Sequence, residues 1–147
     1  QRSLSVCTTA GDRRGAAHAC WALGRLDLRA GRLAAAQPRL REALFAFDGF
    51  EMRAPWVGCL EDHAALALAL GDAPLACGLA AAAQRLRDSA HLARSPQMHA
   101  RWSEMVGRLR SALGAVGFDT AWAAASEWDP NEMRKRALGL NAAAGSA

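Results

Sequence analysis

Apolar residues recur along this chain at the three- and four-residue spacing of amphipathic helices. The first such segment runs over residues 14–30 and is followed by Gly31. Its apolar positions are Ala17, Cys20, Leu23, Leu26 and Leu28. This spacing predicts a helix that ends at the glycine, which readily adopts a left-handed backbone. A second helix is predicted over 33–47, with a kink or a late start at Pro38, which removes a backbone hydrogen bond.

The arrangement of helix, glycine and helix then occurs a second time. Helices are predicted over 55–70 and from residue 73 to about 89, with Gly71 between them. A shift of 40 residues aligns Gly31 with Gly71, Leu26 with Leu66, Leu28 with Leu68, Ala36 with Ala76 and Ala43 with Ala83. Because a single hairpin cannot bury its apolar face alone, such a repeat predicts stacked hairpins of the α-solenoid type.

The last third of the chain is also helical in pattern but does not follow the repeat. Ser95 and Pro96 form a helix start signal, and the helix that follows is expected to end at Gly114. A short helix is predicted near 118–125, and Asp129 caps a last one. The organisation expected is the end of a truncated upstream element at 1–12, two hairpins at 13–91, a helical cap at 92–141 and a loose tail at 142–147.

The composition supports an all-α fold and limits the class of partner. The chain contains 36 alanines, whereas Tyr is absent and Val and Ile are nearly so, which favours helices over strands.

The net charge of +4 comes from arginines scattered along the chain, so direct nucleic-acid binding is not expected. The basic cluster of residues 134–136 is interpreted as the solvated face of a terminal helix. No apolar run is long enough to span a membrane.

Motifs that would carry catalysis are missing, so an enzyme is not expected. The sequence contains no GxxxxGK[ST], GxGxxG or GxSxG element. Cys59 and His63 have a spacing that can chelate a metal, but no third ligand lies at a usable local spacing, so neither a metal nor a cofactor is predicted. The four cysteines lack CxxC pairing and are expected to be buried free thiols, which points to the cytoplasm.

Residues 17–43 resemble the tetratricopeptide pattern. Leu23-Gly24 stands where a small residue lets the paired helices approach, Gly31 stands at the turn, and Ala36, Leu40 and Ala43 hold the small-large-small positions of the second helix. The usual aromatic residue of the first helix is Asp27 here, and the second repeat has His63-Ala64 in place of Leu-Gly. The resemblance implies a right-handed superhelix of two hairpins, closed by the helical cap.

Three later segments are similar to the closing part of large ATPase-type bacterial transcriptional regulators of the LuxR and antibiotic-pathway kinds. They are LAAAAQRLRDS at 79–89, RLRSALG at 108–114 and FDTAWAAA at 118–125. Ala125 and Ser126 depart from that pattern, as does the basic cluster at 134–136. The resemblance implies a regulatory module that binds a protein segment, another domain of the same polypeptide or a small effector.

In tetratricopeptide-like stacks the first helix of each hairpin lines a concave groove, which gives candidate binding residues here. They are His18, Trp21, Arg25, Arg29, Glu61 and Ala65. A Trp flanked by arginines suits an acidic peptide, a carboxylate or a planar effector. Two alternatives stay open: Trp21 is covered by an upstream repeat, or the domain is a small-molecule sensor with a closed pocket between the repeats and the cap.

Overall fold

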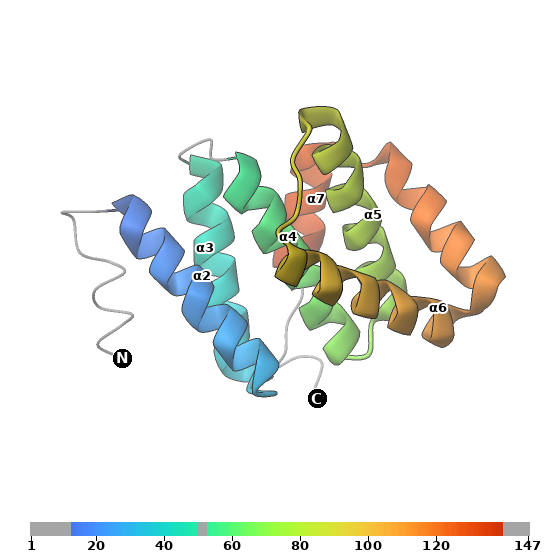
Figure 1. The fold of residues 1–147 in the computed structure, drawn as a ribbon, viewed down its shortest axis with the longest axis horizontal. Coiled ribbons are helices and arrows are strands. Elements are labelled where there is room, and N and C mark those ends of the chain that lie inside the picture. The colour runs from blue at the N-terminus through green and yellow to red at the C-terminus, as the bar shows by residue number, and fades with distance from the viewer. Residues whose placement is uncertain (1–12, 50–52, 140–147) are drawn as a thin grey trace.

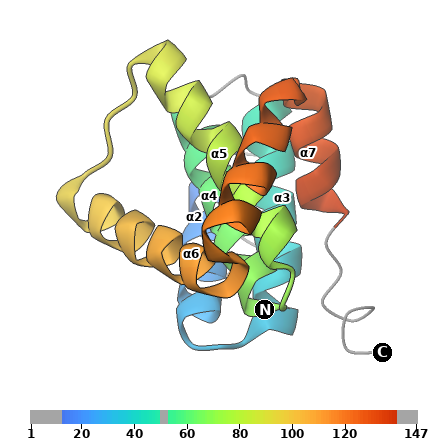
Figure 2. The same ribbon diagram turned by 90° about the vertical axis from the view of Figure 1, so that its right-hand side faces the viewer.

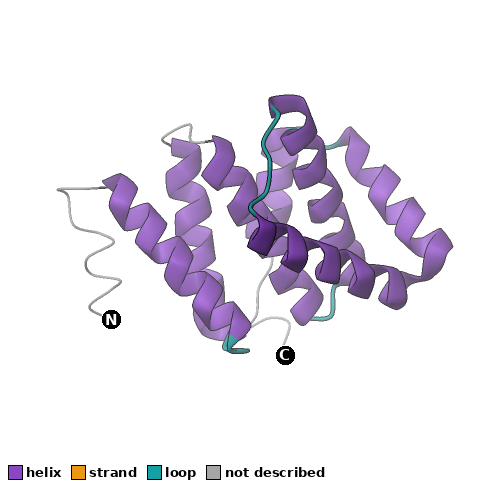
Figure 3. Cartoon of the chain, in the orientation of Figure 1, coloured by secondary structure: helices purple, strands orange, loops and turns teal. Residues whose placement is uncertain are grey.

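The computed structural model describes residues 13–49 and 53–139, and this part of the chain is helical almost throughout (Figure 3). The elements are α2 (Arg13–Arg29), α3 (Leu33–Gly49), α4 (Arg53–Ala69), α5 (Ala73–Ala90), α6 (Pro96–Ala124), the 3₁₀ turn η1 (Ala125–Glu127) and α7 (Pro130–Leu138). No strand occurs within the described ranges. The predicted all-α helical-repeat fold is confirmed, whereas the segments expected at 1–12 and 142–147 lie outside the described residues.

The two elbows of the repeat have the same backbone structure. Gly31 and Gly71 both adopt a left-handed conformation, with φ of 80° and 90°. In each elbow the glycine N–H donates to a carbonyl three residues earlier, and the next N–H donates to a carbonyl five residues earlier. This pair of hydrogen bonds is the Schellman motif, which satisfies carbonyl groups left over at a helix end. The shift of 40 residues therefore relates equivalent turns.

Helices α2, α3, α4 and α5 lie side by side in chain order and form two stacked hairpins (Figure 1). Gly24 is buried against the partner helix, since a Cβ atom there would lie 2.8 Å from Leu40 Cδ2. The largest fully buried side chains include Leu40, Leu44, Phe47, Leu60, Leu66, Leu79, Leu109 and Met133. Because this set extends from α3 to α7, the repeats and the cap share one core.

Pro38 neither delays nor ends its helix, so of the two expected alternatives, a kink or a late start, the late start was wrong. Helix α3 begins at Leu33 and contains Pro38 in its second turn. The proline removes the hydrogen bond that would reach the Ala34 carbonyl. Both residues are exposed. The freed carbonyl lies on the side of the helix that faces water, which can replace the lost bond.

The cap begins and turns at the residues that the sequence indicated. The Ser95 side chain accepts a hydrogen bond from the Met98 N–H at the start of α6, and Asp129 caps α7 in the same way. Helix α6 is broken at Gly114, which has φ 73° and ψ 170°. The first half of α6 crosses α4 and α5, the second half turns back along α5, and α7 packs against α3, α4 and α5 (Figures 1 and 2).

The cysteines only partly follow the expectation of buried free thiols. Cys59 and Cys77 are free and buried. Cys20 is disulfide-bonded, so the prediction was wrong for this residue.

Within the described ranges, no helix combines the length and the apolar character needed to cross a bilayer.

Candidate ligand-binding groove

A hollow of about 540 Å³ lies where the first helices of both hairpins meet the cap. We call it the groove. It is lined by Arg25, Leu28 and Arg29 of α2; by Gly58, Glu61, Asp62, Ala65, Leu68 and Ala69 of α4; and by Met98, Arg101, Trp102, Glu104, Met105 and Arg108 of α6. Its volume falls within the range of about 300–1,000 Å³ that is usual for ligand sites.

Four of the six candidate residues line this groove, and two do not. Arg25, Arg29, Glu61 and Ala65 belong to its lining. His18 and Trp21 are not among its lining residues. The exposed ring of His18 packs against Phe47 at a centroid distance of 5.0 Å.

Trp21 packs between helices instead of presenting its face to the groove. Its ring lies over Gly58, where an added Cβ atom would come within 2.8 Å of the indole. Its Nε1 donates a hydrogen bond of 2.5 Å to Asp62 on α4, and the Arg25 guanidinium lies 5.2 Å from the ring centroid. Trp21 therefore positions Asp62 and Arg25, both of which do line the groove.

Three arginines crowd one end of the groove. Partial desolvation and the positive charges of Arg101 and Arg25 lower the pKa of Arg29, whereas the negative charge of Asp62 opposes this shift. Arg25 has a partial counter-ion, since its Nε lies 3.6 Å from Asp62. Within the described part of the chain, neither Arg29 nor Arg101 forms an ion pair or a side-chain hydrogen bond. The Asp62 carboxylate acts on all three arginines, so three positive charges face one negative charge. The excess positive charge means that this end of the groove favours an anion.

One of the three acidic residues that line the groove, Glu61, is already neutralised by arginines. Glu61 forms a two-point ion pair with Arg87, with N···O distances of 2.7 and 3.0 Å, and also binds Arg94 at 2.6 Å. The Arg94 guanidinium in turn lies 3.8 Å from the Trp102 ring centroid. Because Glu61 is shared by two arginines, it adds little negative charge to the groove and fixes the position of α6 beside α4.

Apolar side chains line the groove between these charges. The half-buried apolar residues are Leu28, Leu68, Met98 and Trp102, and Met105 is buried. Arg29, Arg101 and Arg108 are exposed at its edge. An apolar floor with a cationic rim suits a ligand that carries both apolar groups and carboxylates.

Two neighbouring residues of α4 have strongly altered pKa values in opposite directions. Burial raises the pKa of Asp62 to about 6, although Arg25 and the Trp21 hydrogen bond oppose the shift. Burial lowers the pKa of His63 to about 4, and the nearby Arg41 charge adds to this, whereas the Leu40 carbonyl opposes it. His63 is fully buried, and neither ring nitrogen has a well-formed hydrogen bond within the described structure. It is therefore held neutral in the core.

The Cys59 and His63 pair does not form a metal centre in the described structure. The Cys59 thiol donates to the Leu40 carbonyl at 3.4 Å, and burial raises its pKa well above the usual value. In the described part of the chain, no three His, Cys, Asp or Glu side chains lie close enough together to hold a metal ion.

Sequence reasoning missed the wall of the groove that α6 supplies. Trp102 and Met105 share an apolar stripe of their helix, a pattern typical of core positions, but Trp102 is only half-buried. Arg101, beside it, had no pattern that linked it to Arg25 and Arg29. The one usable signal was Gly58, a small residue at a helix position where a large side chain from another helix can pack.

Comparison with known proteins gives no relative on which a function could be based. No protein-family model, no curated protein and no solved structure matches the chain. The function must therefore be argued from the groove itself.

Proposed function

We propose that this domain is a recognition module whose groove binds an acidic segment of a protein. The segment belongs either to a partner or to another domain of the same polypeptide. One observation carries the proposal: Arg25, Arg29 and Arg101 meet at one end of an apolar groove, and these three positive charges share the carboxylate of Asp62 as their counter-charge. A carboxylate placed there relieves the repulsion and forms charge-assisted hydrogen bonds.

The groove also suits an extended or helical segment better than a single ion. Its apolar residues come from three helices and lie between the cationic positions. A segment with leucine-like side chains on one face and glutamates beside them fills both kinds of position. Recognition through an apolar face with flanking charges is a usual mode of helix binding in grooves.

The resemblance to ATPase-type bacterial transcriptional regulators supplies a context for this proposal. In that context the module restrains or scaffolds a nucleotide-binding or DNA-binding domain, and the acidic segment lies within the regulator or in a protein that controls it. No catalytic role is proposed. The cytoplasmic location proposed for the domain follows from this context alone, because the disulfide at Cys20 removes the argument from free thiols. A small effector is the alternative occupant, because the groove lies between the repeats and the cap.

A peptide-binding experiment tests the proposal. The probe is a fluorescent amphipathic peptide of about 15 residues with Leu on one face and Glu on the other, long enough for partial helix formation. We expect saturable binding, weakened about tenfold by Arg29→Gln or by Arg101→Gln. Raising the ionic strength from about 0.05 to 0.5 M should also weaken it.

The matched control is Arg41→Gln, an exposed arginine of α3 outside the groove, which should leave the affinity unchanged. A version of the peptide with Lys in place of Glu should not bind. The proposal is overturned if the Glu and Lys peptides bind with equal affinity. It is also overturned if Arg29→Gln, Arg101→Gln and Arg41→Gln all lose the same amount of peptide affinity. An apolar small molecule that stabilises the protein and whose binding is insensitive to salt favours the small-effector alternative.

A further inference from the structure

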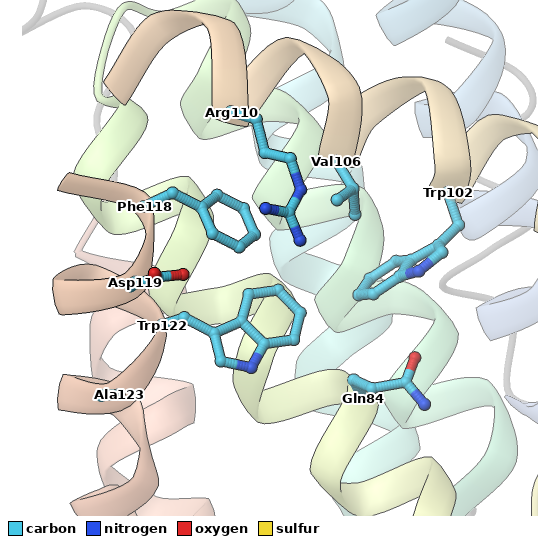
Figure 4. Close-up of a pocket in the computed structure, with 8 residues that line it drawn as sticks. All are labelled: Gln84, Trp102, Val106, Arg110, Phe118, Asp119, Trp122 and Ala123. Carbon is cyan, nitrogen blue, oxygen red and sulfur yellow. The ribbon is translucent and has the colours of Figure 1, made fainter. Parts of the chain in front are cut away.

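A second pocket, of about 410 Å³, lies on the side of α6 where the helix turns back on itself. We call it the aromatic pocket. Its main lining residues are Trp102, Val106, Arg110, Phe118, Asp119 and Trp122 (Figure 4). Only Trp102 is shared with the groove. The left-handed backbone of Gly114 creates the turn that brings the two halves of α6 face to face.

The aromatic rings form a continuous wall. Phe118 and Trp122 are stacked at 5.3 Å, and Trp102 meets Trp122 edge to face at 6.4 Å. Both tryptophans are only half-buried. Their indole N–H groups have no hydrogen-bond acceptor among the described residues. The pocket therefore offers ring surface to a planar apolar group, and unused N–H donors to any acceptor atom beside that group.

Two opposite charges line the same pocket without meeting each other. The Arg110 guanidinium lies 4.2 Å from the Phe118 ring centroid, and Figure 4 shows it between the rings of Phe118 and Trp102. Asp119 lies beside Phe118 on the second half of α6. In the described structure neither Arg110 nor Asp119 has an ion-pair or hydrogen-bond partner. One anion and one cation can thus be bound at separate points around the rings.

We propose that the aromatic pocket binds a free aromatic amino acid. The ring packs against Trp102 and Trp122, the α-carboxylate pairs with Arg110, and the α-ammonium pairs with Asp119. This ligand class matches all three features of the pocket at once, whereas an aromatic residue within a peptide chain lacks both charges. The site is separate from the groove, so it does not depend on the proposed binding of an acidic segment.

The test uses L-phenylalanine and two derivatives that each lack one charge. N-acetyl-L-phenylalanine lacks the ammonium, and L-phenylalanine amide lacks the carboxylate. Isothermal titration calorimetry, with tryptophan fluorescence as a second readout, should show saturable binding of L-phenylalanine. Each derivative should bind about tenfold more weakly, as expected for the loss of one charge-assisted contact.

Two variants assign the charges to their partners. Arg110→Gln should weaken L-phenylalanine about tenfold but leave the amide unaffected, because the amide has no carboxylate to lose. Asp119→Asn should weaken L-phenylalanine but leave the N-acetyl derivative unaffected. Both residues are exposed, so the variants are expected to fold. Arg41→Gln and Glu127→Gln, at exposed sites outside both the aromatic pocket and the groove, are the matched controls and should leave the affinity for L-phenylalanine unchanged.

Three results overturn the proposal. The first is an absence of saturable binding up to about 10 mM L-phenylalanine, well above the concentration at which a weak complex forms. The second is equal affinity for L-phenylalanine and both derivatives. The third is an equal change in L-phenylalanine affinity in the pocket variants and in the control variants.

Discussion

Arg87 pairs with Glu61 at the place where the first repeat packs Phe47 against Trp21. The shift of 40 residues that aligns the two elbows also aligns Trp21 with Glu61 and Phe47 with Arg87. In the first repeat the two rings meet edge to face at 5.5 Å, and in the second a two-point ion pair spans the same helices of the hairpin. The repeat therefore keeps its geometry and changes the chemistry of one contact.

Removal of Glu61 should destabilise the fold more than removal of any exposed acid. Side-chain exposure is 11% for Glu61, 5% for Arg87 and 8% for Arg94, so the variant Glu61→Gln leaves two nearly buried arginines without their counter-ion. We expect a loss of about 3–5 kcal/mol in the free energy of unfolding, measured by urea denaturation. Glu104→Gln, at an exposed site, should stay within about 0.5 kcal/mol of the wild type. A loss below about 1 kcal/mol for Glu61→Gln, a value typical of surface pairs, contradicts this account.

The two elbow glycines should be equally sensitive to a side chain. Gly31 and Gly71 have open space around the position of a Cβ atom, so strain in the left-handed backbone is the main cost of alanine. We expect Gly31→Ala and Gly71→Ala each to cost about 1–2 kcal/mol in thermal or urea unfolding. Gly107→Ala, in an exposed helix interior, should instead stabilise the protein by about 0.5–1 kcal/mol. A large difference between the two elbow variants would show that the elbows are not equivalent.

The contact between Gly78 and Trp128 should control how firmly the cap is attached. A Cβ atom at residue 78 would overlap the Trp128 ring, which lies directly over this glycine. Gly78→Ala should therefore cost about 1–3 kcal/mol, the usual range for overpacking a core. Combining it with Trp128→Leu should recover part of that loss. If the two changes are simply additive in urea unfolding, the two residues are not in contact.

Asp62 and His63 should give the stability opposite dependences on pH over nearly the same range. The pKa of Asp62 is raised to about 6 in the folded state, so its contribution to stability increases as the pH falls from about 6 to 4. The pKa of His63 is lowered to about 4, so its contribution is lost as the pH falls from about 6.5 to 4. The two effects offset each other in the wild type.

Single variants should separate these two contributions. Relative to the wild type, Asp62→Asn should lose stability on acidification, by up to about 1.4 kcal/mol per pH unit. His63→Leu should gain stability over the same interval. Urea unfolding at intervals from about pH 6.5 to 4 provides the comparison. If the free energy of unfolding of the wild type and of both variants changes with pH in the same way, Asp62 and His63 do not have the proposed opposite effects.

Most of the helix ends could be predicted from local signals. The predicted helix over 14–30 is found at Arg13–Arg29, and the cap signals at Ser95 and Asp129 act as expected. These features are local, since each depends on a glycine or a capping side chain within one turn of the helix end. Gly114 likewise breaks α6 where the sequence placed a helix end.

Burial within α2 was harder to predict, because it depends on partners distant in sequence. Leu26 was expected on the apolar face but is 55% exposed, whereas Asp27 is buried. Asp27 is neutralised by hydrogen bonds from Arg32 and Arg39 on the following turn and helix. An aspartate with two arginine partners can occupy a core position that hydrophobicity alone assigns to its neighbour.

Only the sides of the groove formed by α2 and α4 could be predicted, because the side formed by α6 depends on contacts between residues distant in sequence. The positions on α2 and α4 follow from the repeat, which brings Arg25, Arg29, Glu61 and Ala65 together. The wall from α6 depends on the direction in which the chain leaves α5, and no local pattern encodes that direction. Trp21 packs inward because Gly58 leaves room for it, a relationship between residues 37 positions apart in the chain.

Nuclear magnetic resonance of the tryptophan side chains tests the binding role of the groove most directly. The indole N–H signals are to be followed during titration with the acidic amphipathic peptide. Trp102 lines the groove and Trp21 is hydrogen-bonded to a groove residue. By contrast, Trp56 is buried, and Trp128 of the cap packs on Gly78 of α5. If the groove binds the peptide, the signals of Trp102 and Trp21 shift together and saturate, while those of Trp56 and Trp128 stay in place. Saturable binding that moves Trp128 and leaves Trp102 and Trp21 unchanged would contradict this role of the groove.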